Sequence, residues 1–260
     1  MARIYAIANQ KGGVGKTTTV VNLTAYLAGS GRRVLLVDMD PQANATSGVG
    51  RKGATASGGT IYDALTTTRT DLLVTHFVVD TPTPRLSLIP SSRDLAGAEL
   101  ELIRLPEREH RLRYVLEPLR AEYDTILIDS PPSLGLLTLN ALVAADRVLI
   151  PLHCEYFALE GLADLVGTMR RVRAGLNPAL DIEGVLLTMN DERTNLGQQV
   201  ARDVREFFKE KVYNTVIPRN VRLAEAPSHG MPVLAYDARS RGAEAYSAFA
   251  DEFSQRQQAV

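Results

Sequence analysis

A glycine-rich segment near the start of the chain constrains its fold more than any other feature. It reads Lys11-Gly12-Gly13-Val14-Gly15-Lys16-Thr17-Thr18 and lies between a short apolar run and a helix-forming stretch. Glycines at this place let backbone N–H groups converge on phosphate oxygens, and a helix start adds the positive end of its dipole. Lys16 then reaches the terminal phosphates, and the Thr17 hydroxyl can bind Mg²⁺. The eight residues predict a nucleotide site that takes ATP and Mg²⁺.

The segment departs from two other glycine patterns. A strict phosphate-loop pattern has glycine at the position of Gln10, and here a second lysine, Lys11, follows instead. A dinucleotide-binding pattern would begin at Gly13, but Thr18 stands where its third glycine belongs. The lysine-threonine pair of the loop would also have no role in such a site. We therefore reject a dinucleotide site and retain a phosphate loop with an additional lysine.

Short apolar runs alternate along the chain with helix-length segments, as expected of buried parallel strands separated by helices. The first helix should run from Lys16 to Ala28, because Gly29-Ser30-Gly31 stops it. The pattern predicts an α/β fold of the P-loop NTPase class, with a mostly parallel, twisted sheet and helices on both faces. The runs expected as strands are Ile4–Ala8, Val34–Val37, Leu86–Ile89, Thr125–Ile128, Val148–Leu152, Val185–Thr188 and Val212–Ile217.

Composition narrows the class of protein. The 260 residues are 45% hydrophobic, enough for one sizeable core, so we expect a single domain over residues 1–260. The single cysteine, Cys154, excludes a disulfide framework and a multi-cysteine zinc or iron–sulfur site. Neither a signal peptide nor an apolar run of roughly 20 residues is present, so we expect a cytoplasmic protein with no membrane partner. The net charge of −1 requires any DNA contact to be a local patch.

Two of the apolar runs end in aspartate. The second run continues into Asp38-Met39-Asp40-Pro41-Gln42, and the fourth continues into Asp129. Ligands of open α/β sheets bind at the carboxyl ends of the strands, and alternation places Asp38 and Asp40 on the same side of the chain. Asp129 follows a hydrophobic run as a Walker B aspartate does. We therefore expect it to hold Mg²⁺, directly or through water.

The loop and its acidic partners resemble a known family. Lys11–Thr17 resembles the deviant Walker A motif of the ParA/MinD superfamily, and Asp38–Gln42 resembles its switch segment. The resemblance implies that Asp40 orients or polarises the attacking water, with Asp38 nearer the metal and the phosphate loop. It also implies that Lys11 contacts the nucleotide of a second subunit, as an arginine finger does. ATP would then bridge a two-fold homodimer, with Lys11, Lys16 and Asp40 as catalytic residues.

The C-terminal third points to one branch of that superfamily. Residues 218–230 (Pro-Arg-Asn-Val-Arg-Leu-Ala-Glu-Ala-Pro-Ser-His-Gly) and residues 191–197 resemble Soj and other chromosomal ParA proteins. The resemblance implies that Pro218 and Asn220 lie near the adenine. The same stretches carry arginines that would bind double-stranded DNA through its phosphates, without reading its sequence. These expected DNA contacts are Arg193, Arg219 and Arg222.

These features together predict a slow ATPase that acts as a switch. The apo and ADP forms would be monomers, the ATP–Mg²⁺ form a dimer on DNA, and hydrolysis would reset the cycle. A ParB-type centromere-binding partner, implied by the resemblance alone, would accelerate hydrolysis, so that chromosomal or plasmid DNA is segregated or positioned. We expect the protein in the cytoplasm, associated with the nucleoid. Because the first strand starts almost at once, we expect no N-terminal helix-turn-helix domain.

Proteins with several other functions have a similar nucleotide site. A MinD-like regulator would need a membrane-binding helix, but the last helix, near Ala243–Phe253, carries acidic residues opposite its apolar stripe, so we expect it to pack in the core. Nitrogenase-reductase-like proteins need cluster-binding cysteines, and Cys154 is alone. A metabolic enzyme such as an amide-forming ligase, and a nucleotide-gated scaffold without DNA contact, both remain open.

Overall fold

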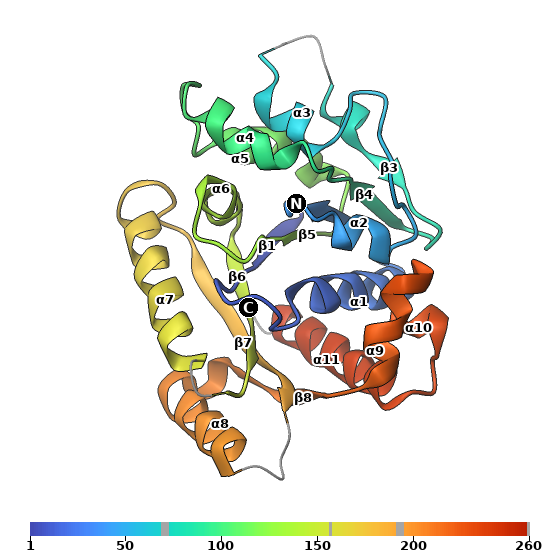
Figure 1. The fold of residues 1–260 in the computed structure, drawn as a ribbon, viewed down its shortest axis with the longest axis vertical. Coiled ribbons are helices and arrows are strands. Elements are labelled where there is room, and N and C mark those ends of the chain that lie inside the picture. The colour runs from blue at the N-terminus through green and yellow to red at the C-terminus, as the bar shows by residue number, and fades with distance from the viewer. Residues whose placement is uncertain (69–72, 156–157, 191–194, 259–260) are drawn as a thin grey trace.

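The computed structural model describes residues 1–68, 73–155, 158–190 and 195–258. Within these residues, eight strands form one sheet in the order β3-β4-β2-β5-β1-β6-β7-β8 (Figure 1). All neighbouring strands are parallel except the β3–β4 pair, which confirms the predicted, mostly parallel α/β fold. The strands are β1 (Arg3–Ile7), β2 (Val34–Asp38), β3 (Val79–Asp80), β4 (Leu86–Ile89), β5 (Thr125–Asp129), β6 (Arg147–His153), β7 (Asp181–Asn190) and β8 (Val212–Pro218).

The antiparallel edge strand β3 is absent from the prediction. It has only two residues and pairs with β4 through Val79 and Leu88, across the turn at Thr81–Pro84. Two residues are too few to produce a recognisable alternation of apolar and polar side chains. β3 covers the outer side of β4 and is itself the edge strand of the sheet.

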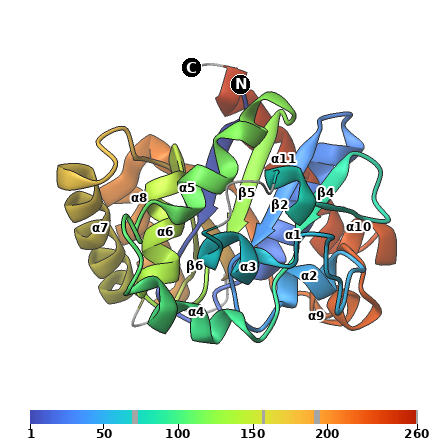
Figure 2. The same ribbon diagram turned by 90° about the horizontal axis from the view of Figure 1, so that it is seen from above.

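Helices cover both faces of the sheet, as predicted, and each face has its own cluster of buried apolar side chains. Figures 1 and 2 show α7 and α8 on one side of the sheet and α10 and α11 on the other. The first face carries α3 (Ile61–Thr66), α4 (Leu95–Leu102), α5 (Arg111–Leu116), α6 (Leu136–Ala144), α7 (Ala158–Gly175) and α8 (Asn195–Phe208). The second carries α1 (Lys16–Gly29), α2 (Asn44–Gly48), α9 (Val221–Glu225), α10 (Val233–Tyr236) and α11 (Arg241–Gln258). Short 3-10 turns are η1 (Val74–Phe77), η2 (Pro118–Ala121), η3 (Lys209–Lys211) and η4 (Ala226–His229). Among all described helices, none has both the length and the apolar character needed to span a membrane.

The strand order determines where the site lies. β5 lies between β1 and β2 in the sheet, although β1 and β2 are consecutive strands in the sequence. In the register of these strands, Asp129 is the partner of both Ile7 and Asp38. The loop after β1 and the aspartates that end β2 and β5 are therefore brought to one edge of the sheet, where ligands of such folds bind.

The last helix, α11, belongs to the core. Its apolar stripe is buried, and Phe249 lies edge-on to Tyr213 of β8, with ring centroids 4.8 Å apart. Phe253 contacts Tyr5 of β1 in a similar way, at 4.9 Å. The expectation that this helix packs on the sheet is thus correct. Glu244 and Asp251 are exposed, whereas Glu252 turns toward β8 and accepts from the amides of Asn214 and Thr215, both at 2.9 Å.

Truncation of Phe249 tests this packing. Phe249→Ala should lower the free energy of unfolding by about 3–5 kcal/mol, because it removes a fully buried ring and leaves a cavity. Urea denaturation followed by circular dichroism measures the loss. Phe207→Ala is the matched control, since Phe207 has the same 4.8 Å edge contact, with Phe208, but is 70% exposed. That control should change stability by no more than about 0.5 kcal/mol, and equal losses would contradict the assignment.

Candidate nucleotide-binding site

The phosphate loop joins β1 to α1 through glycines with left-handed backbone. The φ angle is +74° at Gly13 and +87° at Gly15, which is the N-cap of α1. Residues that carry a side chain rarely adopt these backbone angles, so the loop depends on glycine at both places. The hydroxyl of Thr188 on β7 donates to the carbonyl of Val14 at 2.8 Å and anchors the loop to the sheet. The first amides of α1 face the loop, which suits phosphate oxygens.

The side chain of Lys16 folds back onto the phosphate loop. Its Nζ donates to the carbonyl of Lys11 at 2.9 Å, and the residue is only 6% exposed. Burial lowers the pKa of Lys16, while the negative charges of Asp129 and Asp40 oppose this shift. The Lys16 ammonium thus lies near both carboxylates, at the place where the sequence predicts the terminal phosphates.

Asp129, at the end of β5, has one carboxylate oxygen bonded and one without a partner. The hydroxyl of Thr17 donates to its Oδ2 at 2.8 Å, whereas Oδ1 is buried and makes no hydrogen bond within the described chain. Burial, together with the charge of Asp38, raises the pKa of Asp129 well above its usual value. A cation with oxygen ligands would satisfy this orphaned oxygen. Thr17 and Asp129 therefore fit the predicted Mg²⁺.

The carboxylate of Asp38 is occupied by its own chain. Its Oδ2 accepts hydrogen bonds from the amide and the hydroxyl of Thr46, both at 2.7 Å, and its Oδ1 accepts from the amide of Asp40 at 3.1 Å. Burial raises the pKa of Asp38 to about 6, although these hydrogen bonds oppose the rise. Asp38 therefore ties the end of β2 to α2. Its contact with the metal stays a prediction.

Asp40 is held by the segment around it. Its Oδ1 accepts from the amide of Gln42 at 2.9 Å, and its carbonyl accepts from the hydroxyl of Ser91 at 2.8 Å. Asp40 is 8% exposed, on the edge of the sheet that also carries Lys16. Its charge acts on Lys16 of the loop, and its contact with an attacking water stays a prediction.

The second lysine of the loop, Lys11, contacts its own chain. Its side chain forms an ion pair with Glu155, which follows β6, and its amide donates to Oδ1 of Asn9 at 3.0 Å. The side chain of Lys11 is 29% exposed, so it lies at the mouth of the site rather than inside it. The predicted contact of Lys11 with a nucleotide of a second subunit stays a prediction.

A cavity of about 260 Å³ continues from the phosphate loop toward β8. Pro218, Arg219 and Asn220 line it on one side, and Gly15 and Thr18 close the end next to the loop. Asn220 is also the N-cap of α9, because its Oδ1 accepts from the amide that follows two residues later. The cavity thus brings together the residues expected around the adenine and those expected around the phosphates.

Two of the three arginines expected to contact DNA lie within the described residues. Arg193 lies outside the described residues. Arg219 is exposed and lines the cavity just described. Arg222 is half-exposed and pairs with two carboxylates, with Glu225 at 2.7 Å and with Asp237 at 3.2 Å. These pairs reduce the positive potential that Arg222 presents to a phosphate, an effect that the sequence pattern did not reveal.

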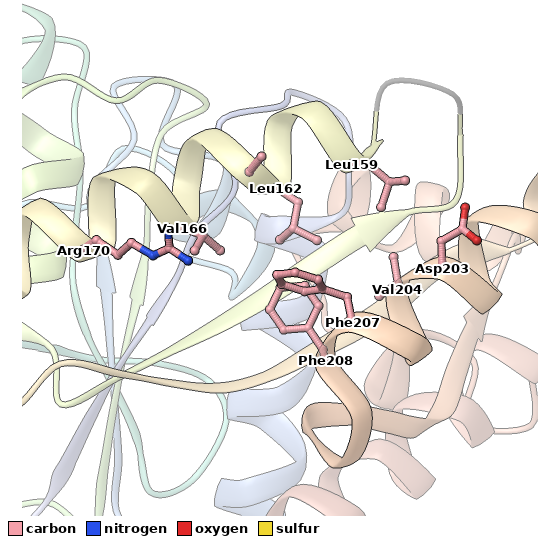
Figure 3. Close-up of a pocket in the computed structure, with 9 residues that line it drawn as sticks. Leu159, Leu162, Val166, Arg170, Asp203, Val204, Phe207 and Phe208 are labelled. Atoms are coloured by element: carbon pink, nitrogen blue, oxygen red, sulfur yellow. The ribbon is translucent and has the colours of Figure 1, made fainter.

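A second pocket lies apart from the nucleotide site. Its volume is about 450 Å³, and it is enclosed by α7 and α8, with Leu162, Phe207 and Phe208 turned toward one another (Figure 3). Arg170 and Asp203 are the charged residues of its lining. It shares no lining residue with the cavity between the phosphate loop and β8, so we assign it no part in nucleotide binding.

Comparison with known proteins decides the family. A family model described as an AAA domain matches residues 2–182. The sporulation initiation inhibitor protein Soj of Bacillus subtilis is 57% identical, over 97% of this chain and 98% of that protein. The chromosome partitioning protein ParA of Myxococcus xanthus is 55% identical, over 98% of this chain and 89% of that protein. The chain belongs to the ParA/Soj family. The resemblance stated from the loop and the C-terminal third is thereby confirmed.

A solved structure extends the comparison to ligands. Cobyrinic acid a,c-diamide synthase from Mycobacterium smegmatis, with bound ATP analogue and magnesium, matches with a TM-score of 0.84 and 36% identity. The match covers 100% of this chain and 97% of that one. ParA/Soj membership and this likeness agree with the predicted ATPase activity and with ATP and Mg²⁺ as cofactors.

Three residues of the ParA/Soj site were missed from the sequence. Asn9 and Glu155 hold Lys11, and Thr188 anchors the phosphate loop. Glu155 did carry a signal, because it follows a predicted strand by three residues, as an acidic ligand often does. Asn9 and Thr188 each depend on a long-range hydrogen bond, to Pro151 and to Val14 respectively, which no local pattern encodes.

Replacing Asp129 tests the metal assignment. Asp129→Asn should weaken ATP binding roughly tenfold or more with Mg²⁺ present, because the amide removes the negative charge that faces the cation. With EDTA the variant should bind ATP as well as the wild type. Isothermal titration calorimetry with and without Mg²⁺ separates the two conditions. Asp251→Asn, on the exposed face of α11, is the control. An unchanged dependence on Mg²⁺ in Asp129→Asn would refute the assignment.

Proposed function

We propose that this chain is an ATP-dependent dimerisation switch that binds double-stranded DNA without sequence preference. It hydrolyses ATP and, with a ParB-type centromere-binding partner, segregates or positions chromosomal or plasmid DNA. The observation that carries the proposal is the convergence of Lys16, Asp40 and the Thr17–Asp129 pair at one edge of the sheet. The names Soj and ParA of its relatives support the DNA cargo. Residues 1–260 would act as one domain, in the cytoplasm and on the nucleoid.

The residues of the loop divide the work of phosphoryl transfer. Lys16 binds the terminal phosphates and offsets their charge, and the amides of the loop hold the nucleotide in line. Asp40 accepts a hydrogen bond from the attacking water and orients it. Bound Mg²⁺ would neutralise charge on the phosphates, held by Thr17 and Asp129. Lys11 from the second subunit supplies a further cation where charge develops.

Dimerisation is energetically feasible with two lysines. A change from about 1:99 to 99:1 dimer requires roughly 5.5 kcal/mol of differential stabilisation. Charge-assisted hydrogen bonds contribute about 1.5–3 kcal/mol each, and a two-fold dimer has two such lysines. Two contacts from Lys11 to phosphate therefore provide much of the bias, and hydrolysis with loss of the terminal phosphate removes part of it.

The name of the solved structure favours one second candidate, an ATP-dependent amide-forming enzyme. Such an enzyme needs ammonia, and its release from glutamine by a thiol requires a reactive thiolate. Cys154 is the single cysteine, is 8% exposed, and has a pKa that burial raises to about 11. ATP turnover that depends on cobyrinic acid and ammonia would support this candidate; turnover that depends on DNA and a centromere-binding partner would support the switch.

Removing the carboxylate of Asp40 should separate dimerisation from hydrolysis. Asp40→Ala should lower ATP turnover on the order of a hundredfold, because the attacking water loses its acceptor, while ATP still produces a dimer. Phosphate release and sedimentation velocity measure the two properties. Asp94→Ala, an exposed position before α4, should leave both unchanged. Normal turnover in Asp40→Ala would exclude Asp40 from the mechanism.

DNA retention provides the most direct test of the switch. Random duplex DNA should be bound with a slowly hydrolysed ATP analogue, but not with ADP or without nucleotide, and binding should fall steeply as salt rises. Arg222→Glu should weaken this binding and leave the ATP-dependent dimer intact. Arg171→Glu, with the same charge change on the exposed face of α7, is the control. Equal DNA affinity in all three proteins would remove Arg222 from the DNA surface.

A further inference from the structure

The start of the phosphate loop is attached to α7 and to the segment before it by two side-chain contacts. Lys11 forms its ion pair with Glu155, and the amide of the Gln10 side chain donates to Oδ2 of Asp164 at 2.7 Å. Gly161 of α7 lies against the Gln10 side chain, so the helix passes close to this part of the loop. The contacts join residues that are far apart in the sequence and lie at the mouth of the nucleotide site.

Both partners of the ion pair are fixed to β6. Nδ2 of Asn9 donates to the carbonyl of Pro151 at 2.9 Å, while its Oδ1 accepts from the amide of Lys11. The amide of Glu155 donates to the carbonyl of His153 at 2.9 Å, and the carbonyl of Glu155 accepts from the first amide of α7. The backbones of Lys11 and Glu155 are therefore placed by the same strand. Their pairing follows from the fold rather than from a chance approach of two long side chains.

The pair is charged and remains open to solvent. The Lys11 ammonium keeps the pKa of Glu155 below its usual value, so the carboxylate is ionised at neutral pH. The side chains are 29% and 40% exposed, respectively. Nδ1 of His153 lies 3.6 Å from the same Glu155 oxygen. An exposed pair of this kind is weak enough to be exchanged for a stronger anion.

We propose that Glu155 is a positioning residue that holds Lys11 on its own subunit and competes with the nucleotide of a second subunit for it. The inference rests on the proposed ATP-dependent dimer. Each lysine that enters the second subunit must first leave Glu155, so two pairs break for every dimer formed. A terminal phosphate carries more negative charge than one carboxylate and wins this competition, which sets how much ATP the switch requires.

The expected size of the effect follows from the weakness of the pair. An exposed ion pair changes an equilibrium constant by up to about fivefold, and a dimer breaks two of them. Glu155→Gln should therefore tighten the ATP-dependent dimer by roughly three- to tenfold. The affinity of the monomer for ATP should not change, because Glu155 does not line the cavity between the phosphate loop and β8.

The test compares dimer dissociation constants by sedimentation with a slowly hydrolysed ATP analogue. Glu160→Gln is the matched control. Glu160 and Lys11 both line an open groove at the mouth of the site, and the substitution removes the same charge. It should dimerise like the wild type. In a Lys11→Ala background, Glu155→Gln should have no effect, since the side chain it releases is gone. A Glu155→Gln dimer as weak as the wild type, or the same gain in Glu160→Gln, would overturn the proposal.

A second measurement is independent of dimerisation. Limiting amine acetylation of the nucleotide-free monomer, read by mass spectrometry, should modify Lys11 about two- to fivefold faster in Glu155→Gln than in the wild type. The exposed Lys52 serves as the internal standard. An unchanged rate of labelling would refute the proposal that Glu155 restrains the Lys11 side chain. Faster labelling with no ATP-dependent dimer in any protein would instead contradict the proposed function, and with it the competition.

Discussion

The hydrogen bond between Thr17 and Asp129 is the interaction on which the site depends. It joins the first turn of α1 to the end of β5 and leaves one carboxylate oxygen buried without a partner. A buried carboxylate oxygen without a partner is costly, and a bound cation with oxygen ligands would satisfy it. Lys16 offsets part of the charge from inside the loop. The other features of the site are arranged around this incomplete pair.

The segment after β2 is joined to α2 and to the segment after β4 by a buried network of hydrogen bonds. Asp38 accepts from the amide and the hydroxyl of Thr46 on α2 and from the amide of Asp40, so it links the two. The hydroxyl of Thr46 also accepts from the amide of Ser91, whose own hydroxyl binds the carbonyl of Asp40. The position of Asp40 is therefore fixed jointly by the end of β2, by α2 and by the segment after β4.

Short stretches of sequence were sufficient to predict those features that depend on neighbouring residues in the chain. The glycines of the loop, the buried strands and Asp129 all follow from backbone freedom, periodicity and strand ends. β3 was missed because two residues carry no period. The pairs Lys11–Glu155 and Arg222–Asp237 were missed because each depends on how distant segments are brought together. The sequence therefore identified the groups of the site but not the carboxylates that restrain its lysine and arginine.

Mixing two inactive variants tests most directly whether the site is completed by a second subunit. Lys11→Ala retains Asp40, and Asp40→Ala retains Lys11, so a mixed dimer contains one complete site of two. Neither variant alone should hydrolyse ATP at an appreciable rate, and an equal mixture should recover roughly a quarter of the wild-type turnover. If the mixture stays inactive while both variants bind ATP and form mixed dimers, Lys11 acts within its own subunit and the account is wrong.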